Sequence, residues 1–288
     1  MSRYLLVSMD HCLVFGARGH LAKTRIIPAL KRMNCPYTPI VRHQVPDLHH
    51  LRDTKDLVAY MSIPTHNFCE AVEPYLEMVD PIYVLEKPHG HSKFDFERIK
   101  DFIHANDLKV IYSDHYLGKD VLYNLWTPKK LKSIKIFIHE DADMTERINY
   151  FDTVGIIGDM YQSHCVTLFA TIIAKHTSRT RKEVLRDLSF VEPRVTQLAR
   201  NIHYKGIAPT QCKISLEYNG ILLEADIAKM MLEKKKLITI NGDRSWNLDA
   251  GWDAYGNVMS EIKHGNRSLF LDEEEVGYLW DHASIISG

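Results

Sequence analysis

The sequence predicts an α/β Rossmann domain followed by an α+β domain that contains a large, mostly antiparallel sheet. Up to about residue 113, short apolar runs alternate with amphipathic stretches, which is typical of βαβ units on a parallel sheet. Beyond residue 130, longer runs alternate apolar with polar residues, which is typical of antiparallel strands with one exposed face. We therefore expect a first domain over residues 1–113 and a second over residues 114–288.

The first part contains short apolar runs that are expected to form strands. They are HCLVFG (11–16), YTPIVR (37–42), DLVAYMS (56–62), IYVLE (82–86) and KVIYS (109–113). The amphipathic stretches between them predict helices over 20–33, 66–78 and 92–106. In the second part the patterns predict strands over 132–140, 210–219, 220–228 and 236–242, and helices over 152–175 and 272–283.

Composition argues against a bulk polyanion as partner. The chain of 288 residues has 36 Lys and Arg against 37 Asp and Glu, so no net field favours nucleic acid or an anionic membrane. Five cysteines without CxxC pairs suit reduced thiols, and hence a cytoplasmic protein, better than a disulfide framework. The N-terminal stretch MSRYLLVSMD is too short an apolar run for a secretory signal or a membrane span.

A glycine-containing loop follows the first expected strand. In LVFGARGHLAK, Gly16 ends the apolar run, Gly19 comes three residues later, and an amphipathic helix follows at once. Backbone amides can approach a pyrophosphate closely where side chains are absent, and a helix N-terminus adds partial positive charge. The loop suits a dinucleotide, and the alternative is a tight turn that binds nothing.

Two arginines favour NADP over NAD as the dinucleotide. Arg42 follows the second expected strand, where an NAD-preferring site usually has an acidic residue for the ribose hydroxyls. A cation there favours a 2′-phosphate, and Arg18 in the loop could add a second contact. The alternative is that both arginines are merely solvent-exposed.

A lysine follows the strand over 82–86. In YVLEKPHG, Lys87 is expected at the carboxyl edge of the sheet, where it could bond a sugar hydroxyl and stabilise negative charge near the reacting carbon. A sharp turn at a site is also where a cis Pro88 would be retained. A strand-ending turn with a surface lysine is the alternative.

The segment SDHYLGKD, 113–120, combines two kinds of chemistry. His115, Tyr116 and Lys119 supply the donors of a clamp for a phosphate monoester. The carboxylate of Asp114 would repel phosphate, so we expect it to orient a histidine that acts as a base. The alternative is a loop whose polar residues are simply solvated.

The long apolar helix expected after residue 152 contains Asp159 and His164. Five residues correspond to about 140° around an ideal α-helix, so these two side chains are not expected to pair. His164 then needs another carboxylate, for which Asp114 is the candidate. A packed core histidine is the alternative.

Four segments together resemble the glucose-6-phosphate dehydrogenase family. FGARGHLAK resembles that family's GASGDLAK loop, EKPHG its EKPFG, SDHYLGKD its RIDHYLGKE, and YFDTVGIIGDMYQSH its YFDEFGIIRDVMQNH. The segments occur in family order. The tail from DAYGNV to GYLWD is similar to the family's DAYERLILD run and closing helix, so the resemblance spans most of residues 12–282.

The resemblance implies a role for each matched residue. His164 is the expected catalytic base, Asp114 its carboxylate partner, and Lys87 the lysine near the reacting carbon. The implied substrate-binding residues are His115, Tyr116 and Lys119 for phosphate, Glu140 and Asp159 for sugar hydroxyls, and Lys229 and Lys234 as a pair that faces the substrate. The implied cofactor-binding residues are Gly16, Arg18, Gly19, His20, Leu21, Arg42, Pro64 and Lys87.

The implied activity is hydride transfer from C1 of glucose 6-phosphate, or a related sugar 6-phosphate, to NADP, in the carbohydrate metabolism of the pentose phosphate pathway. No metal is needed for such a reaction, and a homodimer through the open sheet face is conceivable. The chain departs from the family in its shortened length and in His20, which replaces an Asp of the loop. Two alternatives therefore stay open: a Gfo/Idh/MocA-like dehydrogenase of another sugar or nucleotide sugar, and a non-catalytic protein that binds a sugar phosphate or NADP.

Overall fold

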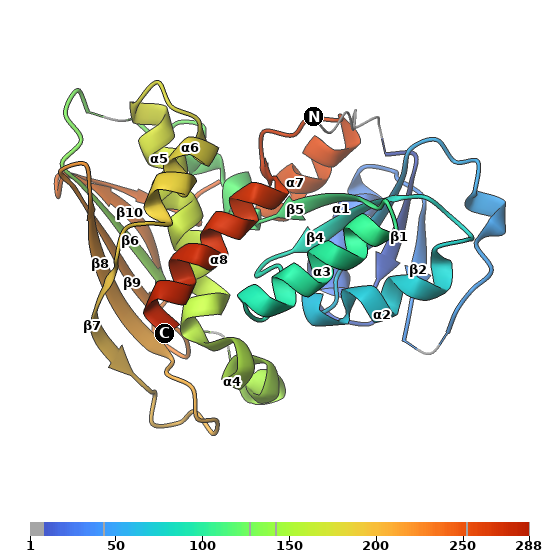
Figure 1. Cartoon of the computed structure of the whole chain (residues 1–288), viewed down its shortest axis with the longest axis horizontal. Coiled ribbons are helices and arrows are strands. Elements are labelled where there is room, and N and C mark those ends of the chain that lie inside the picture. Colours follow the sequence, from blue (N-terminus) through green and yellow to red (C-terminus); the bar gives the residue numbers. More distant parts are fainter. Residues whose placement is uncertain (1–8, 43, 127, 142, 252, 288) are drawn as a thin grey trace. The chain divides into compact units, whose positions relative to one another are not determined.

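The computed structural model describes residues 9–287 except 43, 127, 142 and 252, so most of the N-terminal stretch assessed above lies outside the described residues. The chain divides into two compact units (Figure 1). The first comprises Met1–Gly90, Phe94–Gly118 and Trp252–Glu273, and the second His91–Lys93, Lys119–Gly251 and Glu274–Gly288. Each unit contains one six-stranded sheet.

The sheet of the first unit is parallel except for one short strand. Its order is β12-β5-β4-β3-β1-β2, and β12 runs antiparallel to β5. The central strand β3 is buried at every residue, as expected when helices cover both faces of a parallel sheet. The strands are β1 (His11–Phe15), β2 (Tyr37–Ile40), β3 (Leu57–Met61), β4 (Ile82–Glu86), β5 (Lys109–Ser113) and β12 (Phe270–Leu271).

The helices of this unit follow the predicted ranges with one break. The π-helix η1 (Ala22–Ile26) leads into α1 (Ile27–Arg32), and α3 (Lys93–Ala105) buries Phe96, Ile99 and Ile103 at helical spacing. The single helix expected over 66–78 is instead α2 (Phe68–Val72) between the short turns η3 (Thr65–Asn67) and η4 (Glu73–Tyr75). Pro74 has no N–H for a helical hydrogen bond, which explains why α2 does not continue.

The first unit also includes Trp252–Glu273. The expected boundary at residue 113 assigned this segment to the second domain. Helix α7 (Ala254–Lys263) begins at Asp253, whose carboxylate accepts a hydrogen bond from the Tyr255 N–H at 3.3 Å. Its Val258, Met259 and Ile262 are fully buried in the core cluster of this unit. Phe270 then pairs with Ser113, which adds β12 to the edge of the sheet.

The sheet of the second unit has the order β11-β10-β6-β9-β8-β7, in which only β6 and β9 run parallel. Along β8 exposed or half-buried residues alternate with buried ones, which is typical of a sheet with one open face. The predicted fold class is confirmed. The strands are β6 (Ser133–His139), β7 (Arg194–Ala199), β8 (Gln211–Tyr218), β9 (Ile221–Ala228), β10 (Lys235–Ile240) and β11 (Arg244–Asn247).

The helix predicted over 152–175 is longer and irregular. It consists of α4 (Ile148–Ile156), which is kinked at Gly155, the π-helix η8 (Ile157–Cys165) and α5 (Val166–His176). Helices α6 (Arg181–Leu188) and α8 (Glu273–Ser287) complete the unit, and Figure 1 shows α5, α6 and α8 on one side of its sheet. The remaining short turns are η2 (His49–Leu51), η5 (His115–Gly118), η6 (Asp120–Leu122) and η7 (Thr145–Arg147).

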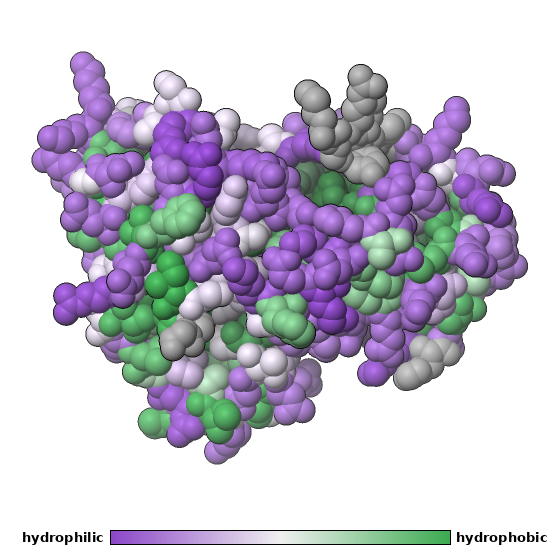
Figure 2. All heavy atoms as spheres, in the orientation of Figure 1, coloured by the Kyte–Doolittle hydropathy of each residue, from purple (hydrophilic) through white to green (hydrophobic). Residues whose placement is uncertain are grey.

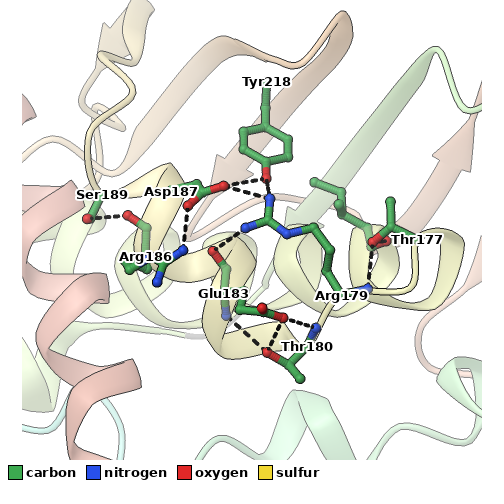
Figure 3. Close-up of polar contacts among 9 residues, drawn as sticks. Thr177, Arg179, Thr180, Glu183, Arg186, Asp187, Ser189 and Tyr218 are labelled. Carbon is green, nitrogen blue, oxygen red and sulfur yellow. Dashed lines mark hydrogen bonds and ion pairs between the residues drawn. The ribbon is translucent and has the colours of Figure 1, made fainter.

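Helix α6 is fixed at its start by a polar network (Figure 3). Thr180 and Glu183 form a reciprocal capping box, which satisfies backbone donors of the first turn. The Arg179 guanidinium donates to Asp187 at 2.6 Å and to the hydroxyl of Tyr218 at 2.5 Å. The network therefore ties the helix to strand β8.

No helix among the described residues combines the length and the apolar composition that crossing a membrane requires. The face drawn in Figure 2 is mainly hydrophilic, with hydrophobic side chains in separate groups between the polar ones. Isolated surface hydrophobics of this kind are normal in folded proteins and need no partner.

Candidate active site

The glycine loop is a tight turn that a side chain at Gly16 would disrupt. Gly16 has φ +69°, and a Cβ there would lie 2.6 Å from the carbonyl oxygen of Ser62. The Gly19 N–H donates to the Gly16 carbonyl at 2.8 Å, which closes the turn just before η1. The sequence places glycine where the loop backbone approaches the end of β3, and Arg18, Gly19 and His20 are exposed.

The other predicted cofactor residues of the first unit lie at the same edge of its sheet. The Ala17 N–H donates to the Ile40 carbonyl at 3.2 Å, so the loop contacts the end of β2. Arg42 follows that strand and is exposed, and Pro64 follows β3 and is also exposed. The carboxyl ends of β1, β2 and β3 thus bring these predicted residues to one edge.

Lys87 follows β4 at this edge. Its backbone N–H donates to the Ser113 carbonyl at 3.1 Å, which joins the ends of β4 and β5. The side chain is half-buried, and the Lys87–Pro88 peptide bond is cis.

A buried acid that sequence reasoning missed precedes Lys87. Glu86 is 5% exposed and accepts a short hydrogen bond from the hydroxyl of Tyr60 on β3. Burial raises the pKa of Glu86 to about 7, although the bond from Tyr60 acts in the opposite direction. The motif EKP contained the residue, but no pattern in the chain indicated that it would be buried beside a tyrosine.

Replacing Glu86 by glutamine should remove part of the pH dependence of stability. Because the pKa of the folded state lies above the ordinary value of 4.5, the stability from protonated Glu86 is present below pH 4.5 and is lost as the pH rises through about 7. The loss is on the order of 3 kcal/mol for such a shift. Urea denaturation between pH 4.5 and 8 should show this loss in the wild type and a flatter profile in Glu86→Gln. The exposed Glu70 is the matched control, and equal profiles for Glu86→Gln and Glu70→Gln would refute the effect.

The predicted phosphate clamp is divided between the two units. In the first unit Asp114 is fully buried, and its Oδ1 accepts the Tyr116 N–H at 2.9 Å. The His115 ring stacks on Tyr255 of α7 with centroids 4.6 Å apart, and its Nδ1 lies 3.2 Å from the tyrosine hydroxyl. Tyr255 fixes the histidine ring, and sequence reasoning did not identify it.

Lys119 directly follows η5 and belongs to the second unit. Its ammonium lies 2.8 Å from the carboxylate of Asp249, and its side chain is mostly buried. A phosphate at Lys119 would share this ammonium with Asp249. The clamp of His115, Tyr116 and Lys119 stays a prediction.

The second unit brings three of the predicted substrate residues into one charge cluster. The Lys229 ammonium lies 2.6 Å from Glu140 and 2.9 Å from Asp159. Two residues that were not predicted join them, because Lys236 contacts Glu140 at 2.9 Å and the Tyr150 hydroxyl donates to Asp159 at 3.2 Å. Two carboxylates and two ammonium groups therefore share one largely buried site.

Strand pairing explains the cluster. Glu140 and Lys229 each follow the end of one of the two parallel strands β6 and β9, and the Glu140 N–H donates to the Ala228 carbonyl at 2.9 Å. Lys236 lies within β10 opposite Ile138 of β6. Lys234 precedes β10, is exposed, and contacts Asp141 at 3.2 Å, so the structure does not bring it to the cluster.

The cluster keeps Glu140 and Lys229 charged. Burial opposes ionisation of Glu140, but the ammonium groups of Lys229 and Lys236 hold the pKa of its carboxyl well below its usual range. Burial likewise opposes the charge of Lys229, whereas Asp159 and Glu140 raise the pKa of its amine above its ordinary value. The site thus offers carboxylate oxygens as acceptors for hydroxyl groups.

His164 lies in the π-helix η8, and its side chain is 3% exposed. In a π-helix the hydrogen bonds join residues five apart, so residues i and i+5 lie near one face. The separation of about 140° expected between Asp159 and His164 holds for an α-helix and therefore does not apply here. The pairing of His164 with Asp114 concerns residues of different units and stays a prediction.

The comparisons with known proteins agree with the motifs. Residues 117–203 match the model of the C-terminal domain of glucose-6-phosphate dehydrogenase. The glucose-6-phosphate 1-dehydrogenase of Buchnera aphidicola subsp. Baizongia pistaciae is 27% identical over 188 residues, 54% of this chain. The matched segments cover only part of the curated relatives: 38% of the length of this one, and 24% and 25% of the lengths of two others.

Solved structures show the same fold at low sequence identity. A glucose-6-phosphate dehydrogenase in complex with glucose 6-phosphate has a TM-score of 0.68 at 16% identity, over 98% of this chain and 92% of that one. A Gfo/Idh/MocA family oxidoreductase from Vibrio cholerae has a TM-score of 0.61 at 11% identity, over 96% and 97%. The resemblance to glucose-6-phosphate dehydrogenases, with a secondary similarity to Gfo/Idh/MocA oxidoreductases, is thereby confirmed.

Proposed function

We propose that this chain is a nicotinamide-dependent sugar dehydrogenase that oxidises C1 of glucose 6-phosphate, or of a related sugar 6-phosphate, with NADP as acceptor and a 6-phosphogluconolactone as product. The observation that carries the proposal is the buried cluster of Glu140, Asp159 and Lys229 on the second unit. Its residues are those that the resemblance assigns to sugar hydroxyls. The relatives named above support the sugar dehydrogenase class.

The glycine loop fits a dinucleotide. Gly16 and Gly19 carry no side chains, so at these two positions backbone amides could approach a pyrophosphate closely. Bound NADP would accept the hydride that leaves C1. Arg42 and Arg18 are exposed at the same edge of the sheet and would contact the 2′-phosphate.

The charge cluster suits a polyol. Glu140 remains ionised, and the carboxyl groups of Glu140 and Asp159 present oxygen acceptors to sugar hydroxyl groups, while Lys229 holds both in place. In the proposal His115, Tyr116 and Lys119 bind the 6-phosphate. The clamp would then make the phosphate a requirement for turnover.

Proton transfer falls to His164 in this mechanism. Its imidazole would take the proton of the C1 hydroxyl as the C1–H bond breaks, so that the ring carbon gains a carbonyl double bond. Asp114 would hold the imidazole in the accepting tautomer and stabilise its charged form. Lys87 would stabilise negative charge that develops near C1.

The test is an absorbance assay for NADPH and NADH. The purified chain is supplied with NADP or NAD and with glucose 6-phosphate, other sugar 6-phosphates or free glucose. We expect NADPH formation that depends on the phosphate. Equal turnover of glucose and glucose 6-phosphate would favour the Gfo/Idh/MocA alternative, and binding without turnover in calorimetry would favour a non-catalytic binding protein.

Replacing Arg42 by alanine should narrow the preference for NADP. A charge-assisted contact to a phosphate is worth ~1.5 to 3 kcal/mol, so kcat/KM with NADP should fall about 10- to 100-fold while the value with NAD changes little. Arg52, also exposed in the first unit, serves as the matched Arg→Ala control. An unchanged NADP to NAD ratio of kcat/KM in Arg42→Ala would remove this residue from the 2′-phosphate site.

A further inference from the structure

A buried tyrosine–histidine pair joins the π-helix η8 to the C-terminal helix α8 within the second unit. The hydroxyl of Tyr161 lies 2.9 Å from Nε2 of His282, and the side chains are 0% and 1% exposed. The other ring nitrogen of His282 lies 2.7 Å from the carbonyl oxygen of Leu188. Both nitrogens of the imidazole therefore have partners.

The partners fix the direction of these hydrogen bonds. Because the Leu188 carbonyl can only accept, Nδ1 of His282 carries the hydrogen and donates it. A neutral imidazole then has Nε2 as acceptor, and the Tyr161 hydroxyl donates to it. Burial lowers the pKa of His282 to about 4, so the ring is neutral near pH 7.

A second contact joins the same two helices. A Cβ placed on Gly158 of η8 would lie 3.6 Å from the ring of Trp280 in α8. Helix α8 therefore lies close to η8 at Gly158 and is hydrogen-bonded to it at Tyr161. These positions flank Asp159, and His164 follows three residues after Tyr161 in the same π-helical run.

This support matters because a π-helix is uncommon and is retained where its surroundings hold it. On the substrate side, Asp159 is already held by Tyr150 and Lys229. Through the hydroxyl of Tyr161, α8 contacts the stretch between Asp159 and His164. Without it, η8 could relax toward α-helical geometry, which would rotate His164 away from the face of Asp159.

We propose that Tyr161 and His282 are positioning residues that keep η8 π-helical and thereby hold His164 in line with the substrate. The inference rests on the proposed function, because it assigns the pair to the placement of the proposed base. Neither residue needs to touch the sugar or the cofactor.

The first test is Tyr161→Phe in the full-length chain. We expect kcat to fall about 10- to 100-fold, since a misplacement of about 1 Å at a reacting group can cost that much. KM for glucose 6-phosphate should stay within about threefold because Asp159 and Lys229 keep their own contacts. Hydrogen exchange of the backbone amides in 157–165 should become faster.

The matched control is Tyr218→Phe. This substitution also removes the hydroxyl of a buried tyrosine of the second unit, but that tyrosine lies on β8 and contacts Arg179, which precedes α6, and Asp187 of α6 (Figure 3). It should lower the melting temperature, leave kcat within about twofold, and leave exchange in 157–165 unchanged. Comparing Tyr161→Phe with Tyr218→Phe therefore distinguishes the general effect of losing a buried hydroxyl from a specific effect on the position of His164.

A second pair of variants tests His282. Glutamine can still accept at one atom and donate at another, so His282→Gln should keep more of kcat than His282→Leu. Because Tyr161 and His282 act through one bond, Tyr161→Phe with His282→Leu should lose little more than the worse single variant.

The exchange measurement separates this inference from the proposed function. Unchanged exchange in 157–165 of Tyr161→Phe would overturn the positioning role whether or not the wild type turns over a sugar phosphate. Faster exchange together with a normal kcat would also overturn the positioning role, because the hydrogen bond would then stabilise η8 without affecting catalysis. Absence of wild-type turnover with every sugar phosphate would refute the proposed function and with it the placement of a base, and faster exchange would then support only the part of the inference in which the pair keeps η8 π-helical.

Discussion

Replacing His164 by asparagine should lower kcat by ~10²- to 10⁴-fold, the usual contribution of a positioned general base. Asparagine keeps the polarity and approximate size of histidine but cannot take the C1 hydroxyl proton. Binding of the sugar phosphate and of NADP should persist, because neither is assigned to this side chain. The measurement pairs kcat with the melting temperature and with the Kd of both ligands.

The control for this variant is His176→Asn at the end of α5, which applies the same substitution in the same helical run. A packed core histidine would give a different result at His164, with the loss in melting temperature and yield rather than in kcat. Asp114→Asn should also lower kcat, because an amide would favour the wrong imidazole tautomer. A folded His164→Asn protein with near-normal turnover would refute the mechanism.

Replacing Lys229 by methionine should lower the free energy of unfolding by ~3 to 5 kcal/mol, the usual cost of removing one partner from a buried ion pair. Glu140 keeps Lys236, so most of the cost falls on Asp159, which is 1% exposed. Sugar-phosphate binding should weaken at the same time, because both carboxylates lose the ammonium that positions them.

Urea denaturation measures the free energy of unfolding of the variant. Repeating the measurement at several pH values shows whether a buried carboxyl causes the loss. With Lys229 gone, no ammonium of Lys229 offsets the burial of Asp159, so the pKa of its carboxyl should rise, and the variant should be relatively more stable at low pH and lose that stability as the pH rises. Lys135→Met is the matched control, since its ammonium lies 3.5 Å from Glu224 in a partly exposed pair. Equal losses of stability in the two variants would contradict the claim that Lys229 stabilises the fold through a buried ion pair.

The parts of the fold that depend on local patterns could be predicted from the sequence. The apolar run 56–62 indicated a strand of the parallel sheet, and the alternation over 210–219 indicated an antiparallel strand with one exposed face. Glu140 and Lys229 were placed in the site by motif resemblance, and the pairing of β6 with β9 explains why they meet.

The parts that depend on contacts between distant segments could not be predicted. Lys236 reaches Glu140 only because β10 pairs with β6 in one particular register, and Tyr150 reaches Asp159 only because of the kink at Gly155. Apolar periodicity does not distinguish a π-helix from an α-helix over nine residues, so η8 was missed.

The return of β12 and α7 to the first sheet has a consequence for the order of folding. Residues 119–251 intervene between β5 and the segment that completes that sheet, so these native contacts have a very high sequence separation. During synthesis on the ribosome, residues 119–251 must emerge before Val258, Met259 and Ile262 can complete the core of the first unit. High contact order of this kind slows folding and prolongs exposure of the apolar surface that α7 covers in the finished unit.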